Sequence, residues 1–187
     1  MEELEKLRFN IRHSTAHIMA EAVMNLFPGT MIGIGPPTND GFYYDFDCPK
    51  QLTKDDFKSI ESAMKKIIKS KRKFSGSTVS REEAKERFKD QNYKIEIIDN
   101  IPNDENVTIW SHESWEDICR GGHVEHTGNI KAFKLLEVAG AYWKGDEKNK
   151  MLQRIYGTAW ESKEEQKLYL EKLELASKRD HRKLGTS

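Results

Sequence analysis

Cysteine, proline and long apolar runs are scarce in this chain. Its 187 residues include two cysteines and five prolines. Two cysteines allow one disulfide at most, and the charged first residues do not resemble a secretory leader. We therefore expect a cytoplasmic protein with reduced, free thiols. No apolar run approaches the roughly 20 residues of a membrane-spanning helix, so we expect no membrane association.

Charge of one sign is not in excess either. Lysine plus arginine and aspartate plus glutamate both number 31, which gives a formal net charge of zero. No global field draws the chain toward nucleic acid, so such binding would need a local basic patch. The apolar fraction is only 36%, but four Trp, eight Phe and six Tyr supply large side chains for one compact domain, alone or with a helical extension.

Apolar residues recur at helical spacing in three long segments. They predict helices over residues 1–27, 53–72 and 161–183, and a short helix over 80–88. Thr53 and Asp56 resemble a capping box at the start of the second helix. In the last helix we expect an inward face made of Tyr169, Leu170, Leu173 and Ala176.

Short segments rich in aromatic and β-branched residues predict strands. These segments are residues 30–35, 41–47, 74–79, 93–98, 107–110, 133–139 and 151–156. The first two are expected to form a hairpin, and residues 140–146 a turn bounded by glycines. Several connections are too short for parallel crossovers. The pattern indicates an α+β fold with a largely antiparallel sheet packed with long helices.

Two stretches combine chemistry-bearing residue types. His13 and His17 lie four residues apart, so a helix would place them on one face. Cys119 and His123 are also four apart and enclose Arg-Gly-Gly, which indicates a tight loop because paired glycines permit positive φ. Three histidines and one cysteine would suit zinc. The same groups would also suit metal-free proton transfer or nucleophilic chemistry, and the residues alone do not decide between these.

The two stretches together resemble the paired signatures of the editing domains of threonyl- and alanyl-tRNA synthetases. Residues 34–36, 40–45, 140–146 and 150–160 are similar to the bacterial threonyl branch. The resemblance covers nearly the whole chain. Gly122 departs from it, because many members carry proline there.

The resemblance implies an editing domain with an α+β fold over residues 1–160. A C-terminal helix over residues 161–187 would pack on it and lead toward an aminoacylation core that is absent here. The implied activity is that of an aminoacyl-tRNA deacylase within a threonine-tRNA ligase. It would hydrolyse the mischarged seryl ester of tRNA(Thr) to free serine and tRNA. The implied partners are the serine-carrying acceptor end of tRNA(Thr) and the rest of the synthetase chain.

The resemblance also implies the pocket residues. The catalytic set is His13, Lys94, Asp117 and Cys119, and the substrate-binding set is Tyr44, His17, Arg120 and His123. We expect His13 to contact a ribose hydroxyl or water and Lys94 to orient water or the ester. Asp117 is expected to hold the seryl amine or hydroxyl. Cys119 is expected to shape the pocket rather than to act as a covalent nucleophile.

Metal use is left open by the same resemblance. Alanyl-type relatives hold zinc through the four equivalent positions, here His13, His17, Cys119 and His123. The threonyl branch does not oblige zinc, so we favour hydrolysis that requires no cofactor, with zinc as the alternative. The competing hypotheses are a non-catalytic tRNA-binding module, a structural zinc module and a free-standing deacylase of the alanyl type.

Overall fold

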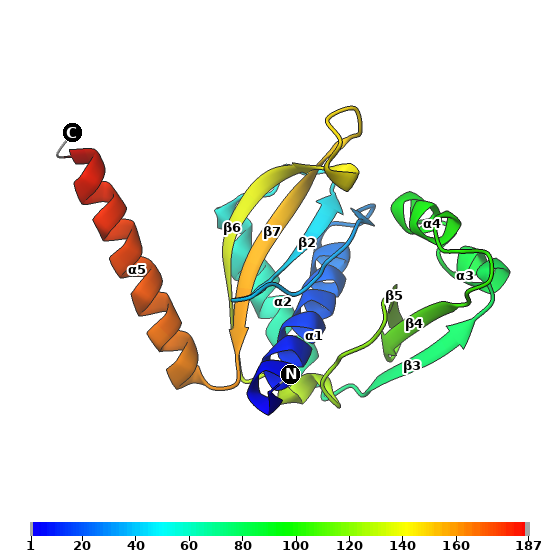
Figure 1. Cartoon of the computed structure of the whole chain (residues 1–187), viewed down its shortest axis with the longest axis horizontal. Helices are drawn as coiled ribbons and strands as arrows, with labels where there is room; N and C mark the ends of the chain where they lie inside the picture. Colours follow the sequence, from blue (N-terminus) through cyan, green and yellow to red (C-terminus); the bar gives the residue numbers. More distant parts are fainter. Residues whose placement is uncertain (1, 186–187) are drawn as a thin grey trace.

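The computed structural model describes residues 2–185, with side chains as far as residue 180 (Figure 1). It contains two sheets whose described strand pairs are all antiparallel. The larger sheet has the order β1 (Met31–Ile32), β2 (Phe42–Asp47), β7 (Met151–Trp160), β6 (Ala132–Tyr142). The smaller sheet has the order β3 (Phe74–Val79), β4 (Val107–His112), β5 (Trp115–Ile118). The predicted α+β class with antiparallel pairing is confirmed.

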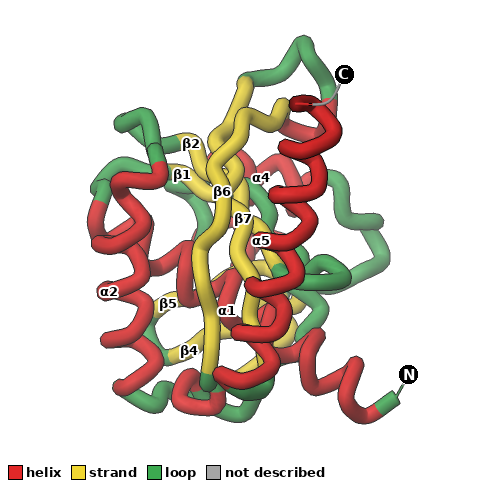
Figure 2. The backbone as a smooth tube through the Cα atoms, turned by 90° about the vertical axis from the view of Figure 1, so that its left-hand side faces the viewer, coloured by secondary structure: helices red, strands yellow, loops and turns green. Residues whose placement is uncertain are grey.

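Five helices and three short 3-10 turns complete the described part of the chain. The helices are α1 (Glu3–Leu26), α2 (Phe57–Lys69), α3 (Arg81–Arg87), α4 (Asn92–Asp99) and α5 (Lys163–Gly185). The 3-10 turns are η1 (Lys54–Asp56), η2 (Thr127–Asn129) and η3 (Trp143–Gly145). Helices α2 and α5 lie on either side of the β6–β7 pair in Figure 2.

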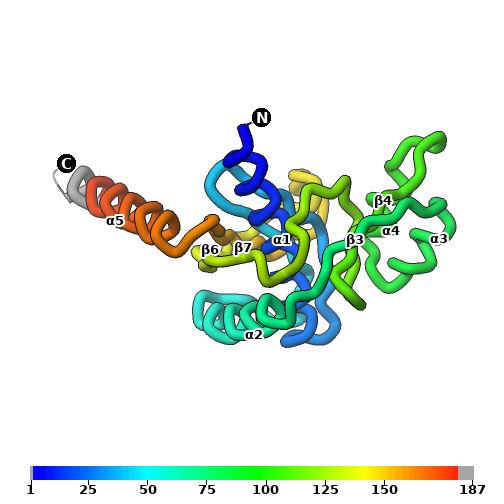
Figure 3. The backbone as a smooth tube through the Cα atoms, turned by 90° about the horizontal axis from the view of Figure 1, so that it is seen from below, coloured from blue at the N-terminus to red at the C-terminus, as the bar shows by residue number. Residues whose placement is uncertain are grey.

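Helix α1 occupies the centre of the molecule. Seen from below, it lies between the β6–β7 pair and the smaller sheet, with α3 and α4 beyond that sheet (Figure 3). Its residues 11–23 are all buried, whereas its first turns are mostly exposed. A helix buried all round normally carries apolar residues. This one carries buried polar groups, among them Arg12, His13, His17 and Glu21, and each needs a partner inside the protein.

Two separate apolar cores support this arrangement. The main core joins α1, α2 and the larger sheet, and it includes Met19, Phe46 and Ile60. A smaller core lies between α3, α4 and the smaller sheet, and it includes Phe88 and Ile98. The smaller core therefore fixes α4 against the sheet that carries the cysteine loop.

The predicted β-hairpin and capping box are confirmed. Strands β1 and β2 pair with Met31 opposite Asp47, although β1 has only two residues. Thr53 and Asp56 form the capping box, but it caps the 3-10 turn, and the α-helix begins at Phe57. The predicted turn at 140–146 starts later than expected, because β6 continues to Tyr142. Strand β7 is also longer than predicted and ends at Trp160.

The predicted strand over residues 93–98 is wrong, because this segment forms helix α4. Lys94 and Ile98 are both buried and lie four residues apart, which is the spacing of one helix face. The isoleucines favoured a strand by propensity, but packing against the smaller core overrides that preference.

The inward face predicted for the last helix is wrong beyond its second turn. Tyr169 packs on Trp160 with ring centroids 5.1 Å apart, and Gln166 donates to the Phe133 carbonyl. Leu173 is 39% exposed and Ala176 is exposed. Helix α5 extends away from the rest of the chain (Figure 1), so its later turns have no surface to pack on. Residues 186 and 187 of the predicted C-terminal segment lie outside the described residues.

Among the described residues, no helix is both long enough and apolar enough to cross a bilayer.

Core and α5 substitutions should differ sharply in their effect on stability. Ile60 is fully buried in α2, so Ile60→Ala should lower the free energy of unfolding by about 2–5 kcal/mol through lost burial and a cavity. Leu173→Ala should change it by less than about 0.5 kcal/mol, because that side chain is already solvated. Urea unfolding followed by circular dichroism would measure both. A large loss for Leu173→Ala would contradict the exposure of α5.

Candidate active site

Five elements bring the predicted site residues to one place. Helix α1 contributes two histidines and β2 contributes Tyr44. Helix α4 contributes Lys94, and β5 contributes Asp117, its second-last residue before the cysteine loop. A cavity of about 270 Å³ lies among them, and the site residues on its walls are His13, His17, Lys94, Asp117, Cys119 and Arg120. Tyr44 and His123 lie behind these walls, in contact with Asp117 and Cys119 respectively.

The three histidines and the cysteine form one cluster. One ligand atom from each of His13, His17, Cys119 and His123 can be chosen so that all four lie within 4.8 Å of one another. The His123 ring stacks on His13 at 4.1 Å between centroids and on Phe74 at 4.6 Å. The sequence spacing predicted this set, and the structure brings it together.

Two glycines allow the loop to approach α1. Gly121 and Gly122 have φ values of +94° and +91°, a conformation that other residues rarely adopt. A Cβ on Gly122 would lie 2.7 Å from a ring carbon of Phe9. The close approach lets the Gly122 carbonyl accept a hydrogen bond from Nδ1 of His13 at 3.2 Å. A neutral His13 then has its proton on Nδ1, which leaves Nε2 as a free acceptor.

Ser14 connects α1 to the other side of the loop. Its Oγ accepts the backbone N–H of Val124 at 3.0 Å and lies 2.9 Å from Nδ1 of His123. With its hydroxyl donating to that nitrogen, His123 carries its proton on Nε2 and donates to Cys119 Sγ at 3.3 Å. The opposite tautomer, with Nδ1 donating to Ser14, would leave Nε2 free for a metal.

Asp117 is the most heavily hydrogen-bonded group of the site. Lys94 Nζ lies 2.5 Å from Oδ1, and the Tyr44 hydroxyl donates to Oδ2 at 2.5 Å. Lys94 also donates to the Tyr44 oxygen at 3.0 Å, and the Ile118 N–H donates to Oδ1 at 2.8 Å. Lys94, Tyr44 and Asp117 are all buried. Nε2 of His17 lies 3.7 Å from Oδ2, too far for a hydrogen bond.

Burial sets the protonation states. It lowers the pKa of His13, His17 and His123, so all three imidazoles are neutral near pH 7. It also raises the pKa of the Cys119 thiol to about 12, which keeps the sulfur protonated. Burial first, and then the neighbouring Asp117, raise the pKa of Tyr44 far above its usual value. The cavity therefore offers neutral acceptors, a neutral thiol and one compensated carboxylate.

The histidine–cysteine cluster has the donor set of a zinc site. Ligand atoms around a tetrahedral zinc ion lie roughly 3.3–3.8 Å apart, so modest side-chain movements would gather the four atoms around an ion. Nδ1 of His17 is buried and has no hydrogen-bond partner among the described residues. These observations fit a metal at His13, His17, Cys119 and His123, although the same groups are equally suited to bind water and substrate.

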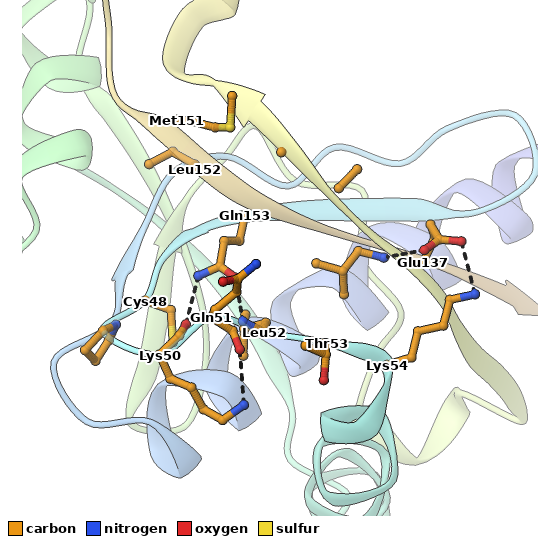
Figure 4. Close-up of a pocket in the computed structure, with 14 residues that line it drawn as sticks. Cys48, Lys50, Gln51, Leu52, Thr53, Lys54, Glu137, Met151, Leu152 and Gln153 are labelled. Atoms are coloured by element: carbon orange, nitrogen blue, oxygen red, sulfur yellow. Dashed lines mark hydrogen bonds and ion pairs between the residues drawn. The ribbon is translucent and has the colours of Figure 1, made fainter.

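A larger cavity of about 670 Å³ lies elsewhere, between residues 48–54 and the β6–β7 pair (Figure 4). Several of its polar side chains are engaged within the protein. Gln153 bridges the Leu52 N–H and the Lys50 carbonyl, and Lys54 pairs with Glu137 at 3.2 Å. No cluster of titratable groups corresponding to that around Asp117 lines this part of the described chain. The smaller cavity is therefore the candidate active site.

The structure also adds residues that sequence reasoning missed. Ser14 was not among the predicted site residues, yet its hydroxyl lies 2.9 Å from Nδ1 of His123 and orients that ring. Phe74 supports the His123 ring, and Phe9 lines the cavity one helical turn before His13. Spacing on the helix could have found Phe9, since positions 9, 13 and 17 share one face. Arg120 is exposed at the cavity rim and has no hydrogen bond to the described residues.

Comparison with known proteins identifies the family to which the chain is similar. Residues 107–156 match the model of the family described as "Threonyl and Alanyl tRNA synthetase second additional domain". The chain is similar to Threonine--tRNA ligase of Staphylococcus aureus strains JH9 and Newman, with 53% identity over 175 residues in each case. The similarity covers 94% of this chain and 27% of each relative. The chain thus spans about a quarter of the length of these curated relatives.

The neutral thiol predicts slow chemical modification. A thiol with a pKa of about 12 is ionised to less than ~0.1% at pH 8, so iodoacetamide should alkylate Cys119 at least ~100-fold more slowly in the folded chain than in the urea-unfolded chain. Peptide mapping by mass spectrometry would give both rates. Equal rates would mean that the folded site carries a reactive thiolate and would restore Cys119 as a candidate nucleophile.

Proposed function

Because the chain belongs to the family of second additional domains of threonyl and alanyl tRNA synthetases, we propose that it is an editing deacylase. It hydrolyses the seryl ester of tRNA(Thr) to free serine and tRNA. The observation that carries this proposal is the cavity where His13, Lys94 and Asp117 converge. Its partners are the acceptor end of tRNA(Thr) and the rest of a threonyl-tRNA synthetase. We place the reaction in the cytoplasm, where both free cysteines stay reduced.

The proposed reaction is needed because a binding pocket distinguishes serine from threonine only weakly. Serine differs from threonine by one methyl group, and a pocket discriminates such a difference by only about 1–3 kcal/mol. Synthesis alone therefore releases some seryl-tRNA(Thr). A second site that hydrolyses this ester and rejects the larger threonyl ester removes the error.

His13 is the group best placed to handle a proton. Its Nδ1 is held by the Gly122 carbonyl, so Nε2 is the free acceptor of the ring. The lowered pKa leaves this nitrogen unprotonated near pH 7. We assign it to the attacking water or to a ribose hydroxyl next to the ester. In either place it fixes the geometry of attack, which is a large part of the catalytic gain.

Lys94 and Asp117 provide charge at fixed positions. The Lys94 ammonium has three N–H donors, and Asp117 and Tyr44 accept two of them. We assign the third to the water or to the oxygen that gains negative charge as the ester is attacked. Asp117 fixes Lys94 and presents a negative charge on the cavity wall, where the α-ammonium of the seryl group would bind. Cys119, as a neutral thiol, shapes the wall.

Zinc is the alternative for the same cluster. If it were bound by His13, His17, Cys119 and His123, it would polarise the attacking water or the ester carbonyl. The donor set fits, but the shared use of His13 means that metal binding and the water contact proposed above compete for one nitrogen. We propose hydrolysis without a metal.

A purely RNA-binding module explains the site less well. Lys94 is 2% exposed and its charge is already neutralised by Asp117, so it is not free to bind a phosphate. A structural zinc module would not need the Lys94–Asp117–Tyr44 group beside its ligands. The deacylase proposal accounts both for the histidine–cysteine cluster and for the Lys94–Asp117–Tyr44 group.

Loss of His13 should abolish most of the activity. His13→Ala should reduce kcat/KM for release of serine from seryl-tRNA(Thr) by ~100-fold or more, because positioned proton transfer contributes about that much. His126→Ala is the matched control, since His126 only caps η2, and it should change the rate by less than about threefold. Threonyl-tRNA(Thr) should be hydrolysed at least ~10-fold more slowly than the seryl ester. Equal effects of the two histidine substitutions would contradict the site assignment.

Metal removal separates the two mechanisms. Chain purified without chelator should retain its deacylase rate after dialysis against EDTA and o-phenanthroline, with zinc measured by mass spectrometry before and after. The reason is that the proposed water contacts come from protein groups. Loss of activity that added zinc restores would overturn the metal-free mechanism, and unfolding on chelation would favour a structural ion.

A further inference from the structure

Phe9 is an exposed aromatic side chain next to the candidate active site. It is 40% exposed although it lies on α1, the most buried helix of the molecule. Its ring lies edge-on to that of His13, with centroids 5.8 Å apart, and it forms part of the cavity wall. The exposed face of this aromatic ring, beside His13, is available to a flat ligand such as an aromatic base.

The cysteine loop leaves room for this ring. The position that a Cβ of Gly122 would take is 2.7 Å from Phe9 Cε1. The absent side chain therefore allows the ring to lie against the loop. The loop, the ring and His13 form one continuous wall.

A second cavity begins on the other side of Phe9. It has a volume of about 430 Å³, and Phe9, Arg8, Arg12, Thr38 and Asn39 line it together with the exposed Glu5. Phe9 is thus shared by the two cavities. A ligand that enters the active site through this cavity must pass the Phe9 ring and contact Arg8 and Arg12.

Arg12 is a buried cation without a carboxylate partner. Only 4% of the residue is exposed, and its donors go to the carbonyls of Ala159 and Asn39 at 3.0 and 2.8 Å. Its Nη2 has no partner among the described residues. Burial lowers its pKa and the nearby Arg8 lowers it further, while Asp40 and Glu161 offset part of this effect from a distance. Arg8 differs, because it pairs with Glu161 at 2.7 Å.

We propose that Phe9 and Arg12 form a subsite for the nucleotide that precedes the acylated one on the RNA strand. The Phe9 ring stacks on its base, and the Arg12 guanidinium binds the phosphodiester that joins the two nucleosides. Aromatic side chains stack on unpaired bases, and a guanidinium matches the geometry of phosphate oxygens. Glu5 lies on the exposed part of the same cavity, so the phosphate is placed at the Arg12 end.

This inference rests on the proposed function, since it needs the acylated ribose beside His13. It goes beyond that function because it specifies where the RNA chain leaves the active site. The acylated end must be single-stranded there, because the base on Phe9 is unpaired. The subsite thus reads the chemistry of a single-stranded RNA end and not its base sequence, since every base has a face that can stack.

Two small substrates test the subsite. The seryl ester of adenosine fills only the active site, whereas the seryl ester of the dinucleotide CpA adds one phosphodiester and one base. In the unaltered chain kcat/KM should be ~5- to 100-fold higher for the dinucleotide ester, the range expected for one stacked base. Phe9→Ala should remove most of this gain, because only the Arg12–phosphate contact remains, and Phe9→Tyr should keep it. Both esters react in the same active site, so the ratio of their kcat/KM values cancels any effect of the substitution on the hydrolytic step.

Matched controls and salt separate stacking from general effects. Leu7→Ala removes another exposed apolar side chain of α1 and should leave the ratio unchanged. Phe9→Leu keeps an apolar group without a flat face and should lose most of the gain. The gain should shrink only slightly as salt is raised from 50 to 500 mM, because Arg12 is buried and a buried charge pair is screened much less than an exposed one. A ratio near one in the unaltered chain, or one insensitive to Phe9, would overturn the subsite while leaving the deacylase proposal intact.

Failure of the deacylase proposal gives a different result. Neither ester would then be hydrolysed, and titration of unacylated CpA against adenosine, monitored by calorimetry, still decides the subsite. Tighter binding of CpA that Phe9→Ala removes would support a site for an RNA end without hydrolysis. Equal binding of the two ligands would overturn the subsite together with the activity.

Discussion

The buried carboxylate of Asp117 is the contact on which the arrangement depends. Asp117 lies near the end of β5 in the smaller sheet, and it accepts from Lys94 of α4 and from Tyr44 of β2 in the larger sheet. Three elements from distant parts of the chain therefore meet at one charge. Removal of one partner of a buried ion pair costs about 3–5 kcal/mol, because the other charge is left uncompensated. The contacts of Asp117 thus hold the two sheets against each other, and the same carboxylate faces the cavity.

Helix α1 supplies two histidines of the candidate active site, and contacts of its buried polar side chains hold them in place. Because it is buried between the two sheets, its polar side chains cannot reach bulk water and must find partners. His13 and Ser14 find them in the loop of residues 119–123, and Glu21 pairs with His112 and Arg72 at 3.0 and 2.8 Å. The loop can approach only because Gly121 and Gly122 adopt positive φ. Function and fold are linked here, since the contacts that position the histidines also fix the helix.

Much of this could be read from the sequence, and the exceptions have physical causes. The pairs His13–His17 and Cys119–His123 were recognisable because short-range spacing determines which side chains share a helix face or a loop. Lys94 was assigned to the pocket but to a strand, because a segment rich in isoleucine looks alike in both conformations until its packing is known. The face of α5 was misjudged for a related reason: periodicity shows which side of a helix is apolar but not whether a partner surface exists. The role of Ser14 could not be predicted, because it depends on how the loop of residues 119–123 folds against α1, whereas helix spacing alone places Phe9 on the face of His13 and His17.

The protonation states limit how the cavity can act. The histidines are neutral, the thiol is protonated, and the carboxylate is engaged by protein donors. No charged nucleophile is therefore available among these groups, and covalent catalysis by Cys119 would first require removal of a proton held at a pKa of about 12. In the metal-free hydrolysis that we propose, the nucleophile would instead be a water molecule placed by neutral acceptors and by the one ammonium, Lys94. Such a site depends on position more than on basicity, so a substrate whose extra methyl displaced the water would lose the reaction even if it still bound.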